Sequence, residues 1–81
     1  MYCIVEITKY PLSPDYEAHI KDFILRLQMH DGLDITTGET STVVRGDYDL
    51  VMSIVKNEMK VSFDSGIRAA FVLKILNTEA G

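Results

Sequence analysis

The chain has 81 residues, of which 47% are hydrophobic and 25% are charged. This composition is typical of an ordinary globular domain and excludes a disordered tail, a collagen-like repeat and a disulfide-rich knot. A chain of this length builds one core, so we predict a single domain over residues 1–81. Roughly 60–65% of the unfolded chain's surface can be buried at this size, so association with a second copy would strengthen a thin core.

The formal net charge is −4, and the eight lysines and arginines are scattered singly along the chain. Nucleic-acid binding depends on clustered cations, and an anionic membrane surface also attracts clustered cations. The apolar runs are far shorter than the roughly 20 residues that span a bilayer, and no secretory leader is visible. The lone Cys3 has no partner for an intramolecular disulfide. We therefore expect a cytoplasmic protein with no nucleic-acid partner and no membrane insertion.

Residues 2–10 alternate and are rich in β-branched and aromatic types, which predicts a strand with Cys3, Val5 and Ile7 on its buried face. We expect Ser13 to cap a helix that has Pro14 at its first position. Gly32 is expected to end this helix. Apolar residues at helical spacing predict its buried stripe: Tyr16, Ile20, Phe23, Ile24 and Leu27.

Two strands are expected next, at residues 33–40 and 41–45, joined near Gly38. Gly46-Asp47 is predicted to form a turn and the cap of a second helix. The apolar stripe of that helix contains Leu50, Val51, Ile54, Val55 and Met59. A last strand is predicted over residues 67–76, with one apolar face that contains Ile67, Ala69, Phe71, Leu73 and Ile75.

The order βαββαβ predicts an α+β, ferredoxin-like fold, a four-stranded antiparallel sheet with both helices on one face. The other face would be left open, with Glu6 either paired to Lys74 across neighbouring strands, which we favour, or in contact with a ligand. An open face that is half apolar usually meets a second sheet or a ligand. Its expected residues are Ile4, Glu6, Thr8, Tyr10, Arg68, Ala70, Val72 and Lys74.

Few side chains could support catalysis. His19 and His30 are placed on one face of the first helix, about 16 Å apart by the helical rise, so they cannot share a metal ion. Cys3 is expected to be a buried structural thiol. No phosphate-binding glycine loop or metallohydrolase motif is present. We therefore predict no catalytic residue, no metal site and no enzyme activity.

The run Thr36-Thr37-Gly38-Glu39-Thr40-Ser41-Thr42 is the most unusual feature of the sequence. It is compatible with a plain threonine-rich strand pair, because threonine favours strands. It is also compatible with a hydroxyl-lined site that recognises donors and acceptors on a small polar ligand. Tyr10, at the end of the first strand, is either an exposed tyrosine or a cover for a planar ligand.

Residues 6–12 (EITKYPL) and 32–52 (GLDITTGETSTVVRGDYDLVM) resemble the YkoF-like family of thiamine- and hydroxymethylpyrimidine-binding proteins. The resemblance implies a binding module without a catalytic step or cofactor, which serves the uptake or handling of thiamine precursors. Ser41 and Thr42 match the family's Ser-Thr motif and are the implied pyrimidine contacts. Glu39 and Thr40 stand where the family tends to carry small or apolar residues, and an acidic Glu39 would favour the cationic thiazolium of thiamine.

Members of that family typically carry two tandem copies of this unit, whereas this chain has one. The resemblance therefore implies a homodimer or a tetramer, assembled through the open sheet face or the outer strand edges. A ferredoxin-like oligomerisation or regulatory module without a thiamine ligand is the alternative. Acyl-phosphate hydrolysis is disfavoured because the loop after the first strand lacks an arginine, and RNA binding is disfavoured because the central strands lack exposed aromatic residues.

Overall fold

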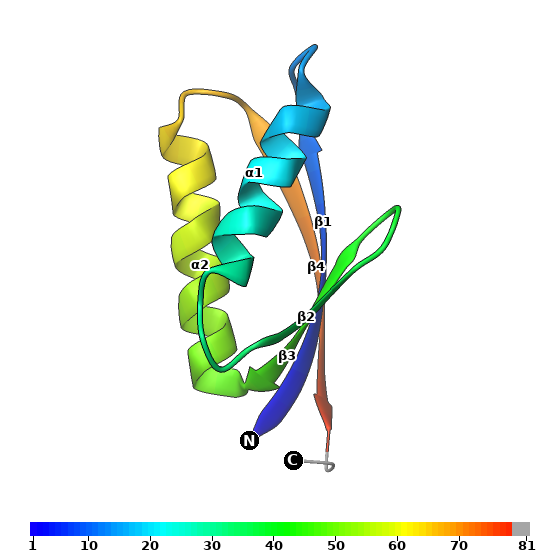
Figure 1. Ribbon diagram of the computed structural model, residues 1–81, viewed down its shortest axis with the longest axis vertical. Helices are drawn as coiled ribbons and strands as arrows, with labels where there is room; N and C mark the ends of the chain where they lie inside the picture. Colours follow the sequence, from blue (N-terminus) through cyan, green and yellow to red (C-terminus); the bar gives the residue numbers. More distant parts are fainter. Residues whose placement is uncertain (79–81) are drawn as a thin grey trace.

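The computed structural model describes residues 1–78. Its strands form one sheet in the order β2-β3-β1-β4, in which all neighbouring strands are antiparallel. Both helices lie on one side of this sheet (Figure 1), so the predicted ferredoxin-like α+β fold is confirmed. The elements in chain order are β1 (Tyr2–Pro11), α1 (Tyr16–Gln28), β2 (Asp34–Thr37), β3 (Thr42–Asp47), α2 (Tyr48–Asp64) and β4 (Ala69–Thr78).

The core lies between the sheet and the helices. In β1 every second residue is buried, because successive strand residues point to opposite faces of the sheet. Cys3 is fully buried, as predicted. Each fully buried large apolar side chain contributes about 1.5–3 kcal/mol, so this single layer supplies most of the driving force for folding. The buried apolar residues are Cys3, Val5, Ile7, Phe23, Leu27, Val44, Val51, Ile54 and Val55.

The start of α1 differs from the prediction. Ser13 is not the cap and Pro14 is not helical; the helix begins at Tyr16, and Asp15 precedes it without a side-chain cap. The Ser13 hydroxyl donates a hydrogen bond to the Asp15 carboxylate instead of binding a backbone N–H of the helix. A local side-chain contact therefore competes with capping at this position.

The end of α1 also differs. The helix stops at Gln28, well before Gly32, so His30 lies beyond the helix and not on its face as predicted. Gly32 has φ +86°, a left-handed conformation that glycine adopts without steric cost. Its role is to direct the chain into β2 after the helix has already ended.

The end of β3 and the start of β4 also differ from the prediction. Gly46 and Asp47 do not form a turn but extend β3, and Asp47 then caps α2 as predicted by accepting a hydrogen bond from the Leu50 N–H. The last strand begins at Ala69 and not at residue 67. Arg68 therefore does not belong to the open sheet face, and its carbonyl accepts a hydrogen bond from the Leu12 N–H at 2.8 Å.

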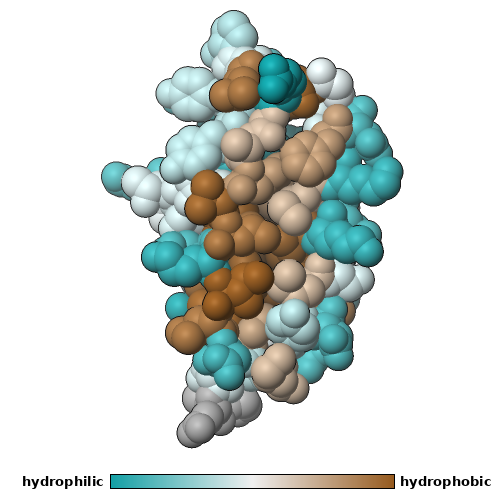
Figure 2. All heavy atoms as spheres, turned by 180° about the vertical axis from the view of Figure 1, so that it is seen from behind, coloured by the Kyte–Doolittle hydropathy of each residue, from teal (hydrophilic) through white to brown (hydrophobic). Residues whose placement is uncertain are grey.

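The strand β4 presents an exposed apolar edge. It is the outermost strand on one side of the sheet. Its Val72, Ile75 and Leu76 side chains are 57%, 48% and 57% exposed, and Phe63 of α2 is 50% exposed beside it. Seen from behind, the molecule carries a hydrophobic patch along its long axis (Figure 2). The expectation that Ile75 belongs to the buried face is therefore wrong, because the helices do not cover this part of the edge strand.

An ionic network connects the two helices. Arg26 of α1 donates from Nε to Oε1 of Glu58 on α2 at 2.8 Å, and His30 Nε2 lies 2.8 Å from Oε2 of the same carboxylate. The Glu58 side chain is only 12% exposed. Burial raises the pKa of the Glu58 carboxyl, but hydrogen bonds from His30 and Arg26 outweigh this effect and hold the pKa below its ordinary value of 4.5. The ionised carboxylate therefore stabilises the packing of α1 on α2.

We expect Glu58→Gln to lower the free energy of unfolding at pH 7 by about 1.5–3 kcal/mol, the range for hydrogen bonds to charged groups. The stabilisation from a carboxyl with a lowered pKa is complete above the ordinary pKa and is lost as pH falls through the lowered value. The wild-type protein should therefore lose more stability than the variant as pH decreases below 4.5. Urea unfolding at several pH values measures both effects.

Asp64→Asn is the matched control, because the Lys60–Asp64 pair is exposed on both sides. Exposed pairs contribute about 0–1 kcal/mol. An equal loss of stability in Glu58→Gln and Asp64→Asn would show that the network between the helices has no special role.

Candidate functional site

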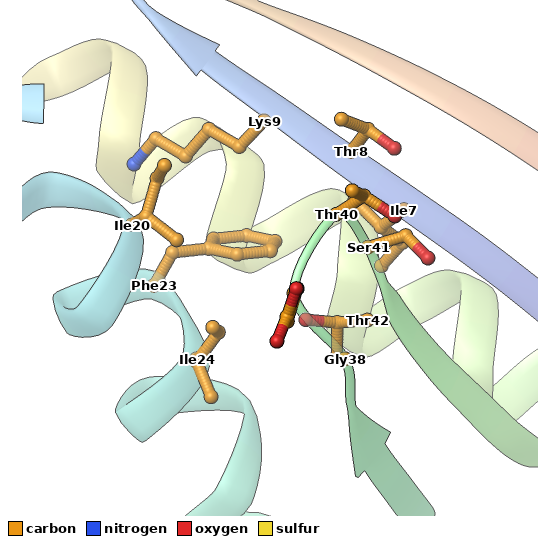
Figure 3. A pocket seen from close by; sticks show the side chains of 11 residues that line it. Ile7, Thr8, Lys9, Ile20, Phe23, Ile24, Gly38, Thr40, Ser41 and Thr42 are labelled. Atoms are coloured by element: carbon orange, nitrogen blue, oxygen red, sulfur yellow. The ribbon is translucent and has the colours of Figure 1, made fainter. Parts of the chain in front are cut away.

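A small cavity lies where β1 extends beyond its pairing with β3. The pairing of β1 with β3 ends at Ile7, opposite Thr42, whereas β1 continues to Pro11 along β4. The β2–β3 turn is closed by a hydrogen bond from the Gly38 N–H to the Ser41 carbonyl at 2.9 Å. A cavity of about 70 Å³ lies between this turn, the end of β1 and α1 (Figure 3). The different lengths of the strands therefore produce the hollow.

The inner cavity has an apolar wall and a polar wall. The apolar wall consists of Ile7 from β1 and of Ile20, Phe23 and Ile24 from α1. Ile20 and Ile24 are only partly buried although they lie on the predicted helical stripe, because they face the cavity. The polar wall comes from the β2–β3 turn and the start of β3: Gly38, Glu39, Thr40, Ser41 and Thr42.

A larger outer pocket of about 440 Å³ adjoins the inner cavity. Small-molecule sites usually have volumes of about 300–1,000 Å³, so the inner cavity alone is too small for such a ligand. The outer pocket adds Tyr10, Pro11, Leu12 and Tyr16 to the lining. The residues shared by both pockets are Thr8, Lys9, Ile20, Glu39 and Thr40.

All five predicted binding residues line one or both pockets. Ser41 and Thr42 line the inner cavity, Tyr10 lines the outer pocket, and Glu39 and Thr40 line both. Tyr10 is 53% exposed. The turn and the end of β1 therefore bring together residues that are far apart in sequence.

The Ser-Thr pair is divided between the two faces of the sheet. Thr42 is 5% exposed, and its side chain points into the cavity (Figure 3). Ser41 points away from the cavity (Figure 3), and its hydroxyl donates to Oε2 of Glu6 at 3.3 Å. Adjacent strand residues point to opposite faces, so only Thr42 directs its hydroxyl inward.

Glu6 forms the predicted cross-strand ion pair. Its carboxylate lies 3.4 Å from Lys74 Nζ, and the two residues are direct partners in the β1–β4 register. Because Ser41 also donates to Glu6, this carboxylate links the β2–β3 turn, β1 and β4 on the open face. Glu6 does not line either pocket.

Lys9 is a buried cation that the sequence analysis did not single out. It is 8% exposed and lies on the same face of β1 as Ile7. Its Nζ donates to the His19 carbonyl at 3.1 Å and to the Ser62 hydroxyl at 3.0 Å, and lies 5.3 Å from the centre of the Phe23 ring. The ammonium points away from Thr42 (Figure 3), so the methylene chain lines the pocket. Strict alternation in β1 was the signal that could have revealed this burial.

Burial lowers the pKa of Lys9 from its ordinary value of 10.5, and the nearby Arg26 guanidinium lowers it further. Because the folded state then binds its proton less tightly than the unfolded state, stability rises with pH towards 10.5. We expect this rise to be smaller in Lys9→Met than in the wild type, as measured by urea unfolding between pH 7 and pH 10.

At pH 7 the free energy of unfolding of the Lys9→Met variant should lie within about 1 kcal/mol of the wild-type value. A methionine of similar length removes the cost of burying a charge. Lys56→Met, at an exposed position of α2, is the control and should retain the wild-type pH dependence. Identical pH profiles in the wild type and Lys9→Met would contradict the burial of a charged Lys9.

Each of the two histidines contacts one carboxylate. His19 Nε2 lies 3.3 Å from the Asp15 carboxylate, and His30 contacts Glu58. Residues 1–78 contain no group of three or more histidine, cysteine, aspartate or glutamate side chains that could hold a metal ion. Within the same residues, no helix is both long and apolar enough to cross a membrane.

No family model and no curated protein matches this sequence. Solved structures do match. A Streptococcus pneumoniae protein is 24% identical with a TM-score of 0.89, over 99% of this chain and 90% of that one. A Thermotoga maritima protein, provisionally assigned to thiamine biosynthesis or salvage, is 22% identical with a TM-score of 0.86, over 100% of this chain and 88% of that one.

A third structure, a DUF77 domain of unknown function from Bacillus cereus, is 17% identical with a TM-score of 0.79, over 99% of this chain and 79% of that one. At these identities the similarity establishes a shared fold. The chain therefore shares its fold with these three proteins, one of which is a DUF77 domain.

Proposed function

We propose that this protein binds thiamine or its hydroxymethylpyrimidine precursor in the two adjoining pockets and has no catalytic step. The observation that carries the proposal is an apolar wall that faces a polar wall across a narrow cavity, where the polar wall contains the inward-pointing Thr42 and the acidic Glu39. A flat heteroaromatic ring has apolar faces and a polar edge, which such a site complements. Binding of this kind serves the uptake or handling of thiamine precursors.

The inner cavity suits the edge of an aminopyrimidine. An aminopyrimidine offers an amine donor and ring-nitrogen acceptors, and a threonine hydroxyl can both donate and accept. The inward-pointing Thr42 hydroxyl is the contact that the geometry favours. Because the inner cavity has a volume of about 70 Å³, only the leading edge of the ring enters it and the remainder occupies the outer pocket.

Glu39 and Tyr10 suit the other half of thiamine. Glu39 lines both pockets, so its carboxylate can approach a cationic thiazolium held in the outer pocket. Tyr10 and Tyr16 also line the outer pocket and offer aromatic faces to a cation. We therefore expect the Glu39 carboxylate to make thiamine bind more tightly than the uncharged pyrimidine.

The residues around the inner cavity support binding without catalysis. Its titratable lining residues among residues 1–78 are Glu39 and Lys9. Lys9 is committed to the His19 carbonyl and the Ser62 hydroxyl. The structural similarity to the Thermotoga maritima protein provisionally assigned to thiamine biosynthesis or salvage adds independent support for the ligand class.

Calorimetric titration with thiamine and with hydroxymethylpyrimidine tests the proposal. Saturable heat at micromolar concentration with either compound is the expected result. Absence of heat with both would favour the alternative, a ferredoxin-like oligomerisation or regulatory module without this ligand.

Thr42→Val is expected to weaken binding of both compounds by about threefold to tenfold, because one neutral hydrogen bond contributes about 0.5–1.5 kcal/mol. Valine is well tolerated in strands, so the melting temperature should hardly change. Ser41→Ala should have a smaller effect, since the Ser41 hydroxyl contacts Glu6.

Thr36→Val is the control, because Thr36 lies on β2 and lines neither pocket. If Thr42→Val binds both compounds as tightly as Thr36→Val does, the inner cavity is not the binding site.

Glu39→Gln should weaken binding of thiamine more than binding of hydroxymethylpyrimidine, because only thiamine carries the cation. Asp31→Asn removes the same charge from an exposed position outside both pockets and serves as the control. Titrations of both variants with both compounds measure the difference. Equal losses for the two compounds in Glu39→Gln would remove Glu39 from the site.

A further inference from the structure

The two pockets meet at a junction where the two charged side chains differ in how they face the ligand. The residues that line both pockets are Thr8, Lys9, Ile20, Glu39 and Thr40. Lys9 presents its methylene chain there, because its ammonium points away from Thr42 (Figure 3) and donates to the His19 carbonyl and the Ser62 hydroxyl. Glu39 is exposed. The charge that a group at the junction meets is therefore the carboxylate of Glu39.

The proposed ligands differ in charge at a single carbon atom. In thiamine the exocyclic methylene carbon of the pyrimidine carries the cationic thiazolium, and in hydroxymethylpyrimidine it carries a neutral hydroxyl. A phosphate ester of that hydroxyl carries about 1.5–2 negative charges at pH 7. When the pyrimidine edge enters the inner cavity and the thiazolium lies in the outer pocket, this carbon lies at the junction. The substituent on this carbon is therefore the part of the ligand that Glu39 approaches.

The turn beside the junction is not arranged to hold an anion. Proteins hold phosphate groups with cations, with free backbone N–H groups of turns and with helix N-termini. In the β2–β3 turn the Gly38 N–H already donates to the Ser41 carbonyl at 2.9 Å. The turn instead supplies the Glu39 carboxylate to both pockets. A phosphate group at the junction would therefore face an anion of the same turn.

The start of α1 is also unfavourable for a phosphate group. Tyr16, the first residue of this helix, lines the outer pocket, so the positive end of the helix lies beside that pocket. Asp15 precedes the helix and Glu17 lies in its first turn, so two carboxylates already neutralise this end. Lys21 lines a neighbouring surface hollow together with both carboxylates and lines neither pocket. The helix start therefore does not offset the repulsion by Glu39.

We propose that this site selects its ligand by the charge at the exocyclic carbon, accepting a cationic or neutral substituent and rejecting a phosphate ester. The inference rests on the proposed function, which places the pyrimidine edge in the inner cavity. Glu39 is the residue that determines the selectivity, because like charges repel and its carboxylate lies where the substituent is held. The protein therefore takes thiamine or the free alcohol and not the phosphorylated pyrimidine.

Calorimetric titration of the full chain with hydroxymethylpyrimidine and with its phosphate ester tests the selectivity. The wild type should bind the ester at least about tenfold more weakly than the alcohol, because the ester brings a second anion close to Glu39. The ratio of the two dissociation constants should fall when the salt concentration is raised from about 0.01 M to about 1 M. Over this range the screening length decreases from about 30 Å to about 3 Å.

Two variants of Glu39 connect the selectivity to this residue. Glu39→Gln should reduce the ratio by about threefold or more through tighter binding of the ester. Glu39→Lys should invert the preference, so that the ester binds more tightly than the alcohol. Asp31→Lys makes the same change in net charge at an exposed position outside both pockets and should keep the wild-type ratio. Thermal unfolding of each variant shows that the fold is intact.

The failure of this inference differs from the failure of the proposed function. Equal affinity of the wild type for the alcohol and the ester would overturn the selectivity and leave the proposed function in place. An unchanged ratio in both Glu39→Gln and Glu39→Lys would overturn the role of Glu39. If the wild type binds neither thiamine nor the alcohol, the proposed function fails and this inference fails with it.

Discussion

The central strand β1 determines both the core and the surfaces of this protein. It pairs with β3 on one side and with β4 on the other, so it joins the two halves of the sheet. Its alternation directs Cys3, Val5 and Ile7 towards the helices and Ile4 and Glu6 towards the open face. Because β1 is longer than β3, its last residues form one side of the pockets. The same strand pairs with β4 along its whole length, which leaves β4 as a long outer edge.

Charged groups take part in the packing of the helices on this strand. Lys9 extends from β1 to Ser62 of α2 and to the His19 carbonyl of α1. Arg26 donates to the same Ser62 hydroxyl at 2.7 Å and to Glu58. A small domain buries a smaller share of its surface than a large one, so hydrogen bonds between partly buried charges supplement the apolar core. The cost of burying Lys9 is offset by its hydrogen bonds and by the two phenylalanine rings beside it.

The pockets and the exposed apolar edge that β4 presents lie in separate parts of the molecule. The pockets lie between α1, the β2–β3 turn and the end of β1, whereas the apolar edge is formed by β4 and the end of α2.

The element order, the alternating burial in β1 and β3 and the position of the threonine-rich turn followed from the sequence, because alternation and helical spacing are local properties. So did the Glu6–Lys74 pair, which depends only on strand order and register. Local patterns did not determine where α1 begins, because Ser13 binds Asp15 and not the helix. They also did not separate the roles of Ser41 and Thr42, or reveal that Lys9 is buried. These features depend on which residues lie opposite each other after the helices pack on the sheet, and only the tertiary structure decides this.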